Sequence, residues 1–444
     1  MRTAAFHTLG CKVNAYETEA MQELLEKAGY TIVPFDEPAD VYIVNTCSVT
    51  NVADKKSRQM LHRAKAKNPA ALVVAAGCYV QAAGEKLMED VSIDLIIGNN
   101  KKADLAAILE EHFAGREARE SLIDISAANE YEPLRIEKES DHTRAFVKIQ
   151  DGCNQFCSYC IIPYTRGRVR SRAPKSVVDE VQTLAKSGYQ EIVLTGIHLS
   201  SYGVDFSDGP DLLGLIRTLH GIRGIERIRL GSLEPRVITK DFVRALASMP
   251  KICPHFHLSL QSGCDATLLR MNRHYTCADY LERLSLLRSC FKNPAVTTDV
   301  IVGFPGETEE EFAETKTFLR KAGFFEMHVF KYSRRAGTRA DRMPDQIPEA
   351  VKAERSGELL ALAAEMSKEY CRASLGSAAS VLFEEETELF GRPYMLGHTK
   401  EYIKTALPLT GNGRKADALK NRIFPAILNN FLTDDIIGLQ KLEK

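Results

Sequence analysis

The chain has 444 residues, of which 44% are hydrophobic and 26% charged, and its formal net charge is −1. Because a single hydrophobic core rarely grows beyond about 250–300 residues, this length predicts two or three domains of ordinary globular composition. The near-neutral charge excludes binding to a polyanion through overall charge alone, so local clusters of charge matter more.

The first residues contain no long apolar run, and no segment approaches the ~20 apolar residues that a membrane helix needs. We therefore expect a cytoplasmic protein without a membrane partner. The cytosol keeps thiols reduced. Where the eleven cysteines cluster, they are better interpreted as metal ligands or catalytic groups than as disulfides.

Residues 1–113 alternate strand-like and helical patterns, which favours a small parallel α/β domain. The predicted strands cover residues 4–10, 41–49, 72–80 and 93–98, and the first helix covers residues 16–28. Cys11, Cys47 and Cys78 each fall at or just after the C-terminal end of one strand, the edge where parallel α/β sheets bind ligands. This placement fits a second metal cluster, but free cysteines are also common as small buried hydrophobes. The residues alone leave both interpretations open.

A polar segment, residues 114–143, is predicted to link this domain to a second α/β domain, residues 144–347. Six strand-like segments recur there, at residues 144–150, 191–196, 225–232, 255–263, 296–306 and 326–333. Helical patterns separate them at residues 177–187, 212–220, 241–247, 280–290 and 309–321. Six βα units predict an incomplete version of the parallel barrel that usually closes with eight.

Residues 348–372 form a predicted helical connector, and residues 373–444 show short alternation and glycine-containing turns. That pattern is typical of antiparallel strands, so we expect a small C-terminal β-barrel. The predicted fold class is therefore α/β, with a parallel sheet, a partial barrel and a small β-barrel in that order.

The loop after the first barrel strand contains Cys153, Cys157 and Cys160 in a CxxxCxxC pattern. A 4Fe–4S cluster is normally held by four thiolates, so three cysteines leave one iron open to a small molecule. The C-terminal strand ends are also where parallel barrels place their active sites. Zinc is the alternative, but it needs a fourth cysteine or histidine. The nearby His142 lies on the wrong side of the predicted strand.

The segments around these six cysteines resemble those of the radical-SAM methylthiotransferases, enzymes that cleave S-adenosylmethionine (SAM) to make radicals. The segments are TLGCKVNAYET around Cys11, NTCSVT around Cys47, GCYVQ around Cys78 and DGCNQFCSYCIIPYTRGRVRSR around the barrel triad. The resemblance covers essentially the whole chain in order, and it implies a cluster-binding N-terminal domain, a radical-SAM barrel and a C-terminal TRAM domain. It also implies two 4Fe–4S clusters, one on Cys11, Cys47 and Cys78, and one on the catalytic cysteines Cys153, Cys157 and Cys160, where SAM binds.

Five further segments resemble the surroundings of SAM in that family: LTGIHLSSYG, GSLEP, LSLQSG, MNRHYT and TDVIVGFPGET. The resemblance implies SAM contacts from Tyr159, Thr195, Gly196, His198, Ser232, Glu234, Gln261, Arg273 and Gly303. For each of these residues, barrel packing or a turn glycine is the alternative interpretation.

Members of the family differ in substrate, and TLGCKVN resembles the branch that modifies threonylcarbamoyladenosine in tRNA. The branch for isopentenyladenosine in tRNA more often has YGCQMN, and the branch for an aspartate of a ribosomal protein more often has LGCPKN. The resemblance implies transfer of a methylthio group to carbon 2 of the adenine at tRNA position 37, with SAM as both radical source and methyl donor. The alternatives are the same reaction on the other two substrates, or a non-catalytic zinc-containing RNA-binding protein.

The implied partner is the anticodon loop of tRNA, whose unpaired bases can leave their stack. Two basic runs that follow the first and sixth barrel strands are predicted to contact phosphates, or else to form solvated faces. They are Arg166, Arg168, Arg170 and Arg172, and Lys331, Arg334, Arg335, Arg339 and Arg342. We also expect a reductant of flavodoxin or ferredoxin type and a sulfur donor that the sequence does not identify. Nothing in the sequence demands an oligomer, so we expect a monomer.

Overall fold

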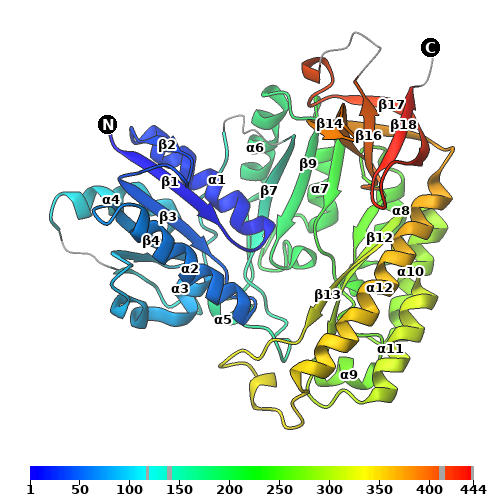
Figure 1. Cartoon of the computed structure of the whole chain (residues 1–444), viewed down its shortest axis with the longest axis horizontal. Helices are drawn as coiled ribbons and strands as arrows, with labels where there is room; N and C mark the ends of the chain where they lie inside the picture. The colour runs from blue at the N-terminus through cyan, green and yellow to red at the C-terminus, as the bar shows by residue number, and fades with distance from the viewer. Residues whose placement is uncertain (117–119, 138–142, 410–415, 442–444) are drawn as a thin grey trace.

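The computed structural model describes residues 1–116, 120–137, 143–409 and 416–441 (Figure 1). Three β systems follow one another along the chain: a parallel sheet, a partial barrel and a closed barrel. Figure 1 shows the N-terminal sheet beside the partial barrel and the C-terminal barrel near one end of its strands. The predicted α/β fold class is confirmed. His142 and parts of the predicted linker lie outside the described residues.

The N-terminal sheet has parallel strands in the order β2-β1-β3-β4-β5-β6. These are β1 Thr3–Thr8, β2 Thr31–Val33, β3 Val41–Thr46, β4 Leu72–Gly77, β5 Leu95–Ile97 and β6 Glu120–Ser121. Every residue of β3 and β4 is buried, because helices cover both faces of a parallel sheet. The helices are α1 Lys12–Lys27, α2 Asn51–Lys67, α3 Cys78–Ala83 and α4 Leu105–Phe113. The predicted strands correspond to β1, β3, β4 and β5, except that the strand predicted at residues 72–80 ends at Gly77 and residues 78–80 belong to α3. β2 and β6 are too short to give a pattern.

The partial barrel has the six parallel strands that the sequence predicts, with an outer layer of helices. Its strands are β7 Arg144–Asp151, β9 Glu191–Gly196, β10 Arg227–Leu230, β11 His255–His257, β12 Ala295–Val302 and β13 Glu326–Lys331. The first three form one sheet and the last three another, and bridges at Ile228–Ile252 and Leu233–Leu258 join the two. The outer helices are α6 Pro174–Lys186, α7 Leu212–His220, α8 Lys240–Ala247, α10 Cys277–Cys290 and α11 Glu309–Ala322. The largest apolar core lies between these helices and the strands.

Short elements beside the barrel triad are absent from the predicted set. They are α5 Ile162–Thr165, β8 Arg170–Ser171 and α9 Asp265–Arg270. β8 pairs antiparallel with the end of β7, so the segment after the triad folds back against the strand that precedes it. Elements of two to six residues carry too few positions for hydrophobic periodicity to reveal them.

The C-terminal barrel covers the end of the partial barrel opposite the cysteine triad. The connecting helix α12 Glu349–Ser374 packs along β13, and the barrel closes in the order β14-β15-β16-β18-β17. Its strands are β14 Ala378–Leu389, β15 Arg392–Thr399, β16 Lys404–Pro408, β17 Ile423–Phe431 and β18 Ile437–Lys441. Arg144, the first residue of β7, pairs with Glu384 of β14 at 2.6 Å. Among the described residues, no helix is long and apolar enough to cross a membrane.

Candidate active site

The barrel triad lies in the loop that follows β7, at the C-terminal ends of the barrel strands. Gly152, just before Cys153, has a φ of 69°, and a Cβ at this position would lie 1.7 Å from the carbonyl oxygen of Arg168. Glycine is therefore required for this close approach of two backbone segments. The Cys153 N–H donates to the carbonyl of Gly167 at 3.0 Å, which fixes the first cysteine of the triad.

The thiols of this triad lie close enough for their charges to interact. Burial raises the pKa of Cys160 to about 12, and the charges of Cys157 and Cys153 raise it as well. Burial likewise raises the pKa of Cys153 to about 11. Arg273 donates from Nη1 to the sulfur of Cys157 at 3.2 Å. Buried thiols whose negative charges oppose one another suit a metal centre, because bound metal ions stabilise thiolates.

Neighbouring strands of the N-terminal sheet assemble the second triad. Cys47 and Cys78 directly follow β3 and β4, and Cys11 directly precedes α1. The approach is close, because a Cβ on Gly10 would lie 2.8 Å from the sulfur of Cys47. Burial raises the pKa of Cys47 to about 11, and the charges of Cys78 and Cys11 raise it further. The cysteines that the sequence places at strand ends therefore come together in space.

Neither triad has the spacing of a single-ion site. Among the described residues, one group has all its potential ligand atoms within 4.8 Å of one another, and it consists of His257, Asp299 and His328. Three thiolates on one zinc ion, each bonded at about 2.3 Å, would lie about 4 Å apart. A cubane cluster binds each thiolate to a different iron and holds the sulfurs farther apart. Neither triad meets the 4.8 Å criterion among the described residues, so a single zinc ion held by all three sulfurs does not match this geometry.

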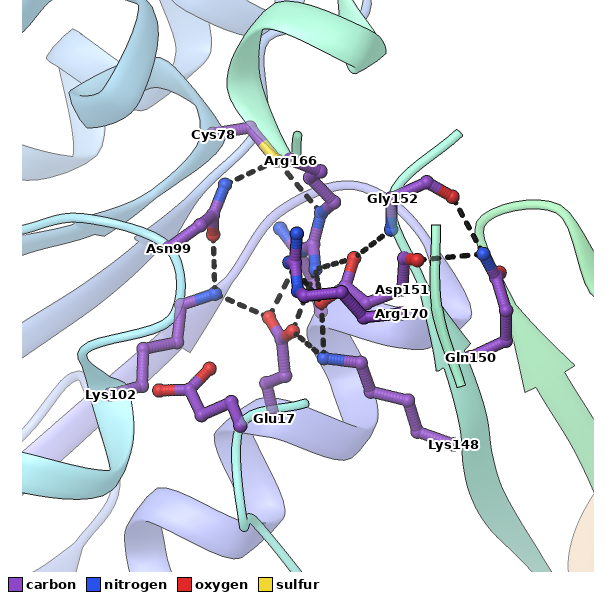
Figure 2. Close-up of polar contacts among 12 residues, drawn as sticks. Glu17, Cys78, Asn99, Lys102, Lys148, Gln150, Asp151, Gly152, Arg166 and Arg170 are labelled. Atoms are coloured by element: carbon purple, nitrogen blue, oxygen red, sulfur yellow. Dashed lines mark hydrogen bonds and ion pairs between the residues drawn. The ribbon is translucent and has the colours of Figure 1, made fainter. Parts of the chain in front are cut away.

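A buried network of charges joins the N-terminal triad to the barrel (Figure 2). Arg166, in the segment after the barrel triad, donates from Nε to the sulfur of Cys78 at 3.3 Å. Its Nη1 lies 2.7 Å from Glu17 and 3.1 Å from Asp151. Asp151 accepts a hydrogen bond from the N–H of Gly152 at 2.8 Å. One arginine thus connects the end of β4 with the backbone that leads into the barrel triad.

Glu17 on α1 is the central anion of this network. It is fully buried and lies 2.5 Å from Lys102, 2.6 Å from Lys148 and 2.7 Å from Arg166. Burial alone would raise the pKa of Glu17, but the three cations hold it well below its usual value. The buried cations here are Lys102, Lys148, Arg166 and Arg170, and the buried carboxylates are Glu17, Asp151 and Glu132. Cations outnumber carboxylates, and an anionic iron–sulfur cluster on Cys78 would offset that surplus.

The prediction that the first basic run contacts phosphates is wrong for most of its arginines. Arg166, Arg170 and Arg172 are at most 3% exposed, while Arg168 is exposed. Arg172 pairs with Glu180 of α6, and the other buried arginines belong to the network around Glu17. Their partner carboxylates lie elsewhere in the sequence, so the run by itself gives no sign that it is internal.

The second basic run is mostly exposed. Its exposed members are Lys331, Arg334, Arg339 and Arg342. Arg335 is buried instead, and it pairs with Asp54 at 2.6 Å and donates to Ser48 Oγ at 2.7 Å. Because Ser48 directly follows Cys47, Arg335 holds the loop of the N-terminal triad against the barrel.

A cavity of about 240 Å³ is lined in part by residues from the loops of both triads. Val49 and Thr50, from the loop after Cys47, line one side, and Tyr159, from the loop of the barrel triad, lines another. The remaining wall consists of Gln261, Asp299, Ile301, Phe330, Lys331, Tyr332 and Ser333. Its aromatic side chains suit a flat aromatic ligand. A larger cavity, of about 690 Å³, lies beside α12 and contains none of the predicted site residues.

Tyr159 and Gln261 are the predicted SAM contacts that line this cavity. Gln261 has a φ of 73°, a left-handed backbone conformation that costs a non-glycine residue free energy. The backbone of Gln261 holds that conformation by donating to the carbonyl of Asp299 (2.9 Å) and accepting from the N–H of Ile301 (2.8 Å). Strained backbone of this kind is concentrated at functional sites.

Four more predicted SAM contacts lie at or just after the C-terminal ends of β9 and β10: Thr195, Gly196, His198 and Glu234. His198 Nε2 lies 3.5 Å from a carboxylate oxygen of Glu234. Burial would raise the pKa of Glu234, but the nearby His198 and the hydrogen bonds from Arg236 lower it to about 2. Glu234 is therefore a buried anion at neutral pH, which suits a ligand that carries an ammonium group.

The other predicted SAM contacts have different surroundings. Arg273 bonds to the sulfur of Cys157, and Ser232 is exposed after β10. Gly303 follows β12 with a φ of 69°, and a Cβ there would lie 2.3 Å from Cγ of Lys352 on α12. The packing of α12 is therefore sufficient to explain the glycine at this position.

Sequence reasoning missed several polar residues around Cys78. Asn99 donates to the sulfur of Cys78 at 3.5 Å and accepts from Lys102 at 2.7 Å. Glu17 lies within TLGCKVNAYET, so a buried polar role could have been suspected from the motif. Asn99 and Lys102 lie in no motif, and their role depends on how β5 and α4 place them.

Two family models match this chain. The model described as "Uncharacterized protein family UPF0004" matches residues 3–98, and the model described as "Radical SAM superfamily" matches residues 147–319. The solved structure of the radical S-adenosylmethionine methyltransferase TsrM from Kitasatospora setae is similar with a TM-score of 0.59. It is 16% identical and covers 76% of this chain and 77% of its own. That likeness concerns the fold alone.

Curated relatives match nearly the whole chain. "Threonylcarbamoyladenosine tRNA methylthiotransferase MtaB" of Bacillus subtilis (strain 168) is 43% identical over 407 residues, which are 91% of this chain and 90% of the relative. "tRNA-2-methylthio-N(6)-dimethylallyladenosine synthase" of Acidothermus cellulolyticus is 40% identical over 390 residues, 86% of this chain and 78% of the relative. The two identities differ little, so they do not by themselves separate the two nucleosides in these names.

Proposed function

Because this chain belongs to the radical-SAM methylthiotransferase family, we propose that it transfers a methylthio group to carbon 2 of threonylcarbamoyladenosine at position 37 of tRNA. SAM would serve as both radical source and methyl donor. An aromatic C–H bond resists acids, bases and nucleophiles of ordinary strength, which motivates a radical route. The observation that carries the proposal is the cavity of about 240 Å³ that residues from the loops of both cysteine triads line, because a base bound there would lie beside both loops.

Each triad is proposed to hold one 4Fe–4S cluster. The cysteines of the SAM-binding cluster are Cys153, Cys157 and Cys160, and those of the sulfur-carrying cluster are Cys11, Cys47 and Cys78. When bound, the barrel cluster and SAM supply the adenosyl radical that activates the adenine carbon. The protein contributes a cation to each site, since Arg273 bonds to Cys157 and Arg166 bonds to Cys78.

The SAM pocket is proposed to use Tyr159, Thr195, Gly196, His198, Ser232, Glu234, Gln261, Arg273 and Gly303. Its charge supports this assignment, because the buried carboxylate of Glu234 is ionised and SAM carries an ammonium group. Tyr159 and Gln261 lie on the cavity wall, where they could contact SAM or the target base.

Exposed cations beside the cavity are proposed to contact tRNA phosphates. Lys331 lines the cavity, and Arg168 lies over the ring of Phe156 in the triad loop at 4.6 Å. Such contacts supply affinity and orientation rather than sequence choice. The C-terminal barrel is a plausible second RNA-holding surface, as it covers the opposite end of the partial barrel.

The choice of threonylcarbamoyladenosine is supported by TLGCKVN and by the relative from Bacillus subtilis. Isopentenyladenosine is the second candidate, because the relative from Acidothermus cellulolyticus, named for the dimethylallyl nucleoside, is 40% identical. Nucleoside mass spectrometry of tRNA from a deletion strain separates the two. Loss of the methylthio mass from threonylcarbamoyladenosine is expected, and an unchanged tRNA profile would rule out both nucleosides.

A further inference from the structure

A second cavity, of about 420 Å³, borders the cavity of about 240 Å³ that is proposed to hold the target base. Three stretches of chain line both cavities: residues 49–54, 159–165 and 331–337. In each stretch, the earlier residues line the smaller cavity and the later residues line the larger one. Because the walls continue from one cavity to the other on three separate segments, the two cavities lie side by side.

A hydrogen bond joins the N-terminal domain to the barrel where the two cavities meet. The N–H of Asn51 donates to Ser333 Oγ at 3.0 Å, and Asn51 lines the larger cavity while Ser333 lines the smaller one. Two neighbouring bases of one strand would therefore enter the two cavities on opposite sides of this bridge. The unstacked bases of a single-stranded RNA loop can be splayed apart in this way.

Tyr164 gives the larger cavity an exposed aromatic surface. It lies in α5, which packs against α3 of the N-terminal domain (Figure 1), and it is 49% exposed. Its ring centroid lies 5.7 Å from that of Phe156, at an interplanar angle of 83°, and the guanidinium of Arg168 lies over the ring of Phe156. Tyr164 is thus supported from one side and open on another. Proteins that bind single-stranded nucleic acids stack bases on aromatic rings of this kind.

Arg335, on the wall of the same cavity, carries a buried donor that has no partner. Its Nη1 pairs with Asp54 at 2.6 Å, and its Nη2 donates to Ser48 Oγ at 2.7 Å. Its Nε has no hydrogen-bond partner among the described residues, although the residue is only 7% exposed. An unpartnered buried donor is costly and uncommon in folded proteins. On a cavity wall, it indicates a ligand that carries an acceptor, such as a ring nitrogen or carbonyl oxygen of a base.

We propose that the cavity of about 420 Å³ binds one of the two bases that flank the target base in the anticodon loop. The flanking base stacks on Tyr164 and accepts a hydrogen bond from Nε of Arg335. This subsite rests on the proposed function, because it takes a second base from the same RNA strand. Capture of the flanking base helps to keep the target base out of its stack. Every base has a π-face, so stacking contributes affinity and positioning rather than a choice between modified nucleosides.

The test uses reconstituted enzyme and three anticodon stem-loops that contain threonylcarbamoyladenosine. One stem-loop is intact, and the other two carry an abasic residue on one or the other side of the target. For the wild type, one of the abasic stem-loops should raise KM by about 5–150-fold, with a smaller change in kcat. Tyr164→Ala should raise KM for the intact stem-loop by a similar factor and should no longer respond to that abasic residue. Tyr164→Phe keeps the ring and should behave as the wild type does.

Phe113→Ala is the matched control. Phe113 is also an exposed aromatic residue, 37% exposed, but it lines a cavity with Arg2 and Leu72. Arg2 precedes β1 and Leu72 begins β4, so this cavity lies at the edge of the sheet opposite the cysteines. Phe113→Ala should match the wild type in KM for all three stem-loops. Equal increases of KM in Phe113→Ala and Tyr164→Ala would overturn the role of Tyr164.

The outcomes separate the subsite from the proposed function. Equal KM values of the wild type for all three stem-loops overturn the subsite alone, whatever the variants do. A wild type that methylthiolates none of them defeats the proposed function, and binding then decides the subsite. For that measurement, 2-aminopurine replaces each flanking base in turn, because stacking quenches its fluorescence. Quenching by the wild type that Tyr164→Ala abolishes supports the subsite, and no quenching at either position overturns it. Because Tyr164 is near Cys160, SAM cleavage to 5′-deoxyadenosine without RNA is measured in each variant and should be unchanged.

Discussion

The two cysteine triads are built in opposite ways. In the barrel, one loop supplies all three cysteines, and a glycine with a required left-handed conformation precedes the first. In the N-terminal sheet, segments at the ends of three parallel strands supply one cysteine each. The first arrangement is mostly local, whereas the second requires the correct order of strands. Damage to the sheet should therefore disturb the N-terminal site before the barrel site.

The arginines that donate to the two triads also differ, because one bonds only within the barrel and the other joins two parts of the chain. Arg273, which bonds to Cys157, also bonds to Tyr275 at 3.0 Å within the barrel. Arg166, which bonds to Cys78, reaches from the barrel to Glu17 of the N-terminal sheet region. The N-terminal site therefore depends on contact between two parts of the chain.

Loss of a cysteine should have the largest effect and a different result at each triad. The complete enzyme should bind about eight irons, and either Cys157→Ala or Cys78→Ala should leave about four. Cys157→Ala should abolish both SAM cleavage and methylthio transfer. Cys78→Ala should abolish transfer but keep formation of 5′-deoxyadenosine, because the barrel triad remains complete. Iron analysis and product chromatography under anaerobic conditions measure these quantities.

Cys253→Ala serves as the control, because Cys253 is buried beneath the barrel and belongs to neither triad. It should retain about eight irons and full activity. Activity in Cys157→Ala would contradict the radical-SAM assignment. An iron count near four in the wild type, unchanged by Cys78→Ala, would remove the N-terminal cluster from the comparison.

Removing the central anion of the network should destabilise the protein strongly. Glu17→Gln leaves Lys102, Lys148 and Arg166 buried with less compensating charge. Breaking a buried ion pair from one side costs about 3–5 kcal/mol. We expect a loss of this size in the free energy of unfolding, measured by chemical denaturation. Glu26→Gln, at an exposed position of the same helix, should change stability by less than about 0.5 kcal/mol, and equal losses in both variants would contradict this role.

The same comparison explains which features of the two triads could be predicted from the sequence. The barrel triad is visible as a pattern because its members are near neighbours, and the six barrel strands lie within apolar runs of the sequence. The strand-end positions of Cys11, Cys47 and Cys78 could also be predicted, since each follows an apolar run. Their mutual approach depends on β1, β3 and β4 being adjacent, which pattern alone does not establish.

The arginines after the barrel triad show where sequence reasoning fails. Four arginines that alternate with other residues look like a solvated or phosphate-binding face. Three of them are buried, because β8 folds back against β7 and carboxylates from α1, β7 and α6 meet them. Charge in a sequence does not reveal its partner when that partner is distant along the chain.

Ion pairs remote from both triads provide a test that does not involve metal ligands. Glu191 at the start of β9 is buried with Arg229 and Arg227. Burial would raise the pKa of Glu191, but these arginines lower it from 4.5 to about 2. Because the folded pKa is below the unfolded value, the stabilisation is complete above about pH 4.5 and is lost as the pH falls toward 2. At about 1.4 kcal/mol per pKa unit, the full contribution is about 3 kcal/mol.

Glu191→Gln should therefore be less stable than the wild type at pH 6, and the difference should shrink as the pH falls to about 3.5. The difference between the two proteins is measured by denaturation at each pH, so that any acid loss of iron affects both equally. A difference that stays constant over this range would show that Glu191 is not ionised in the folded protein.

The smallest effect on iron binding should come from changing the two arginines that donate to cysteine sulfurs. Residues that hydrogen-bond to metal ligands typically contribute about 10–100-fold in metal affinity or activity. Arg166→Met is tested in a Cys157→Ala background, where only the N-terminal cluster remains, and Arg273→Met in a Cys78→Ala background, where only the barrel cluster remains. Each should weaken iron retention about 10–100-fold during chelator challenge.

Arg166→Lys keeps the charge but loses the planar fork that reaches Cys78, Glu17 and Asp151 together. It should therefore recover protein stability more than iron retention. If Arg166→Met in the Cys78→Ala background also releases iron, the barrel site depends on the interface as well, and the contrast between a local and an assembled triad fails.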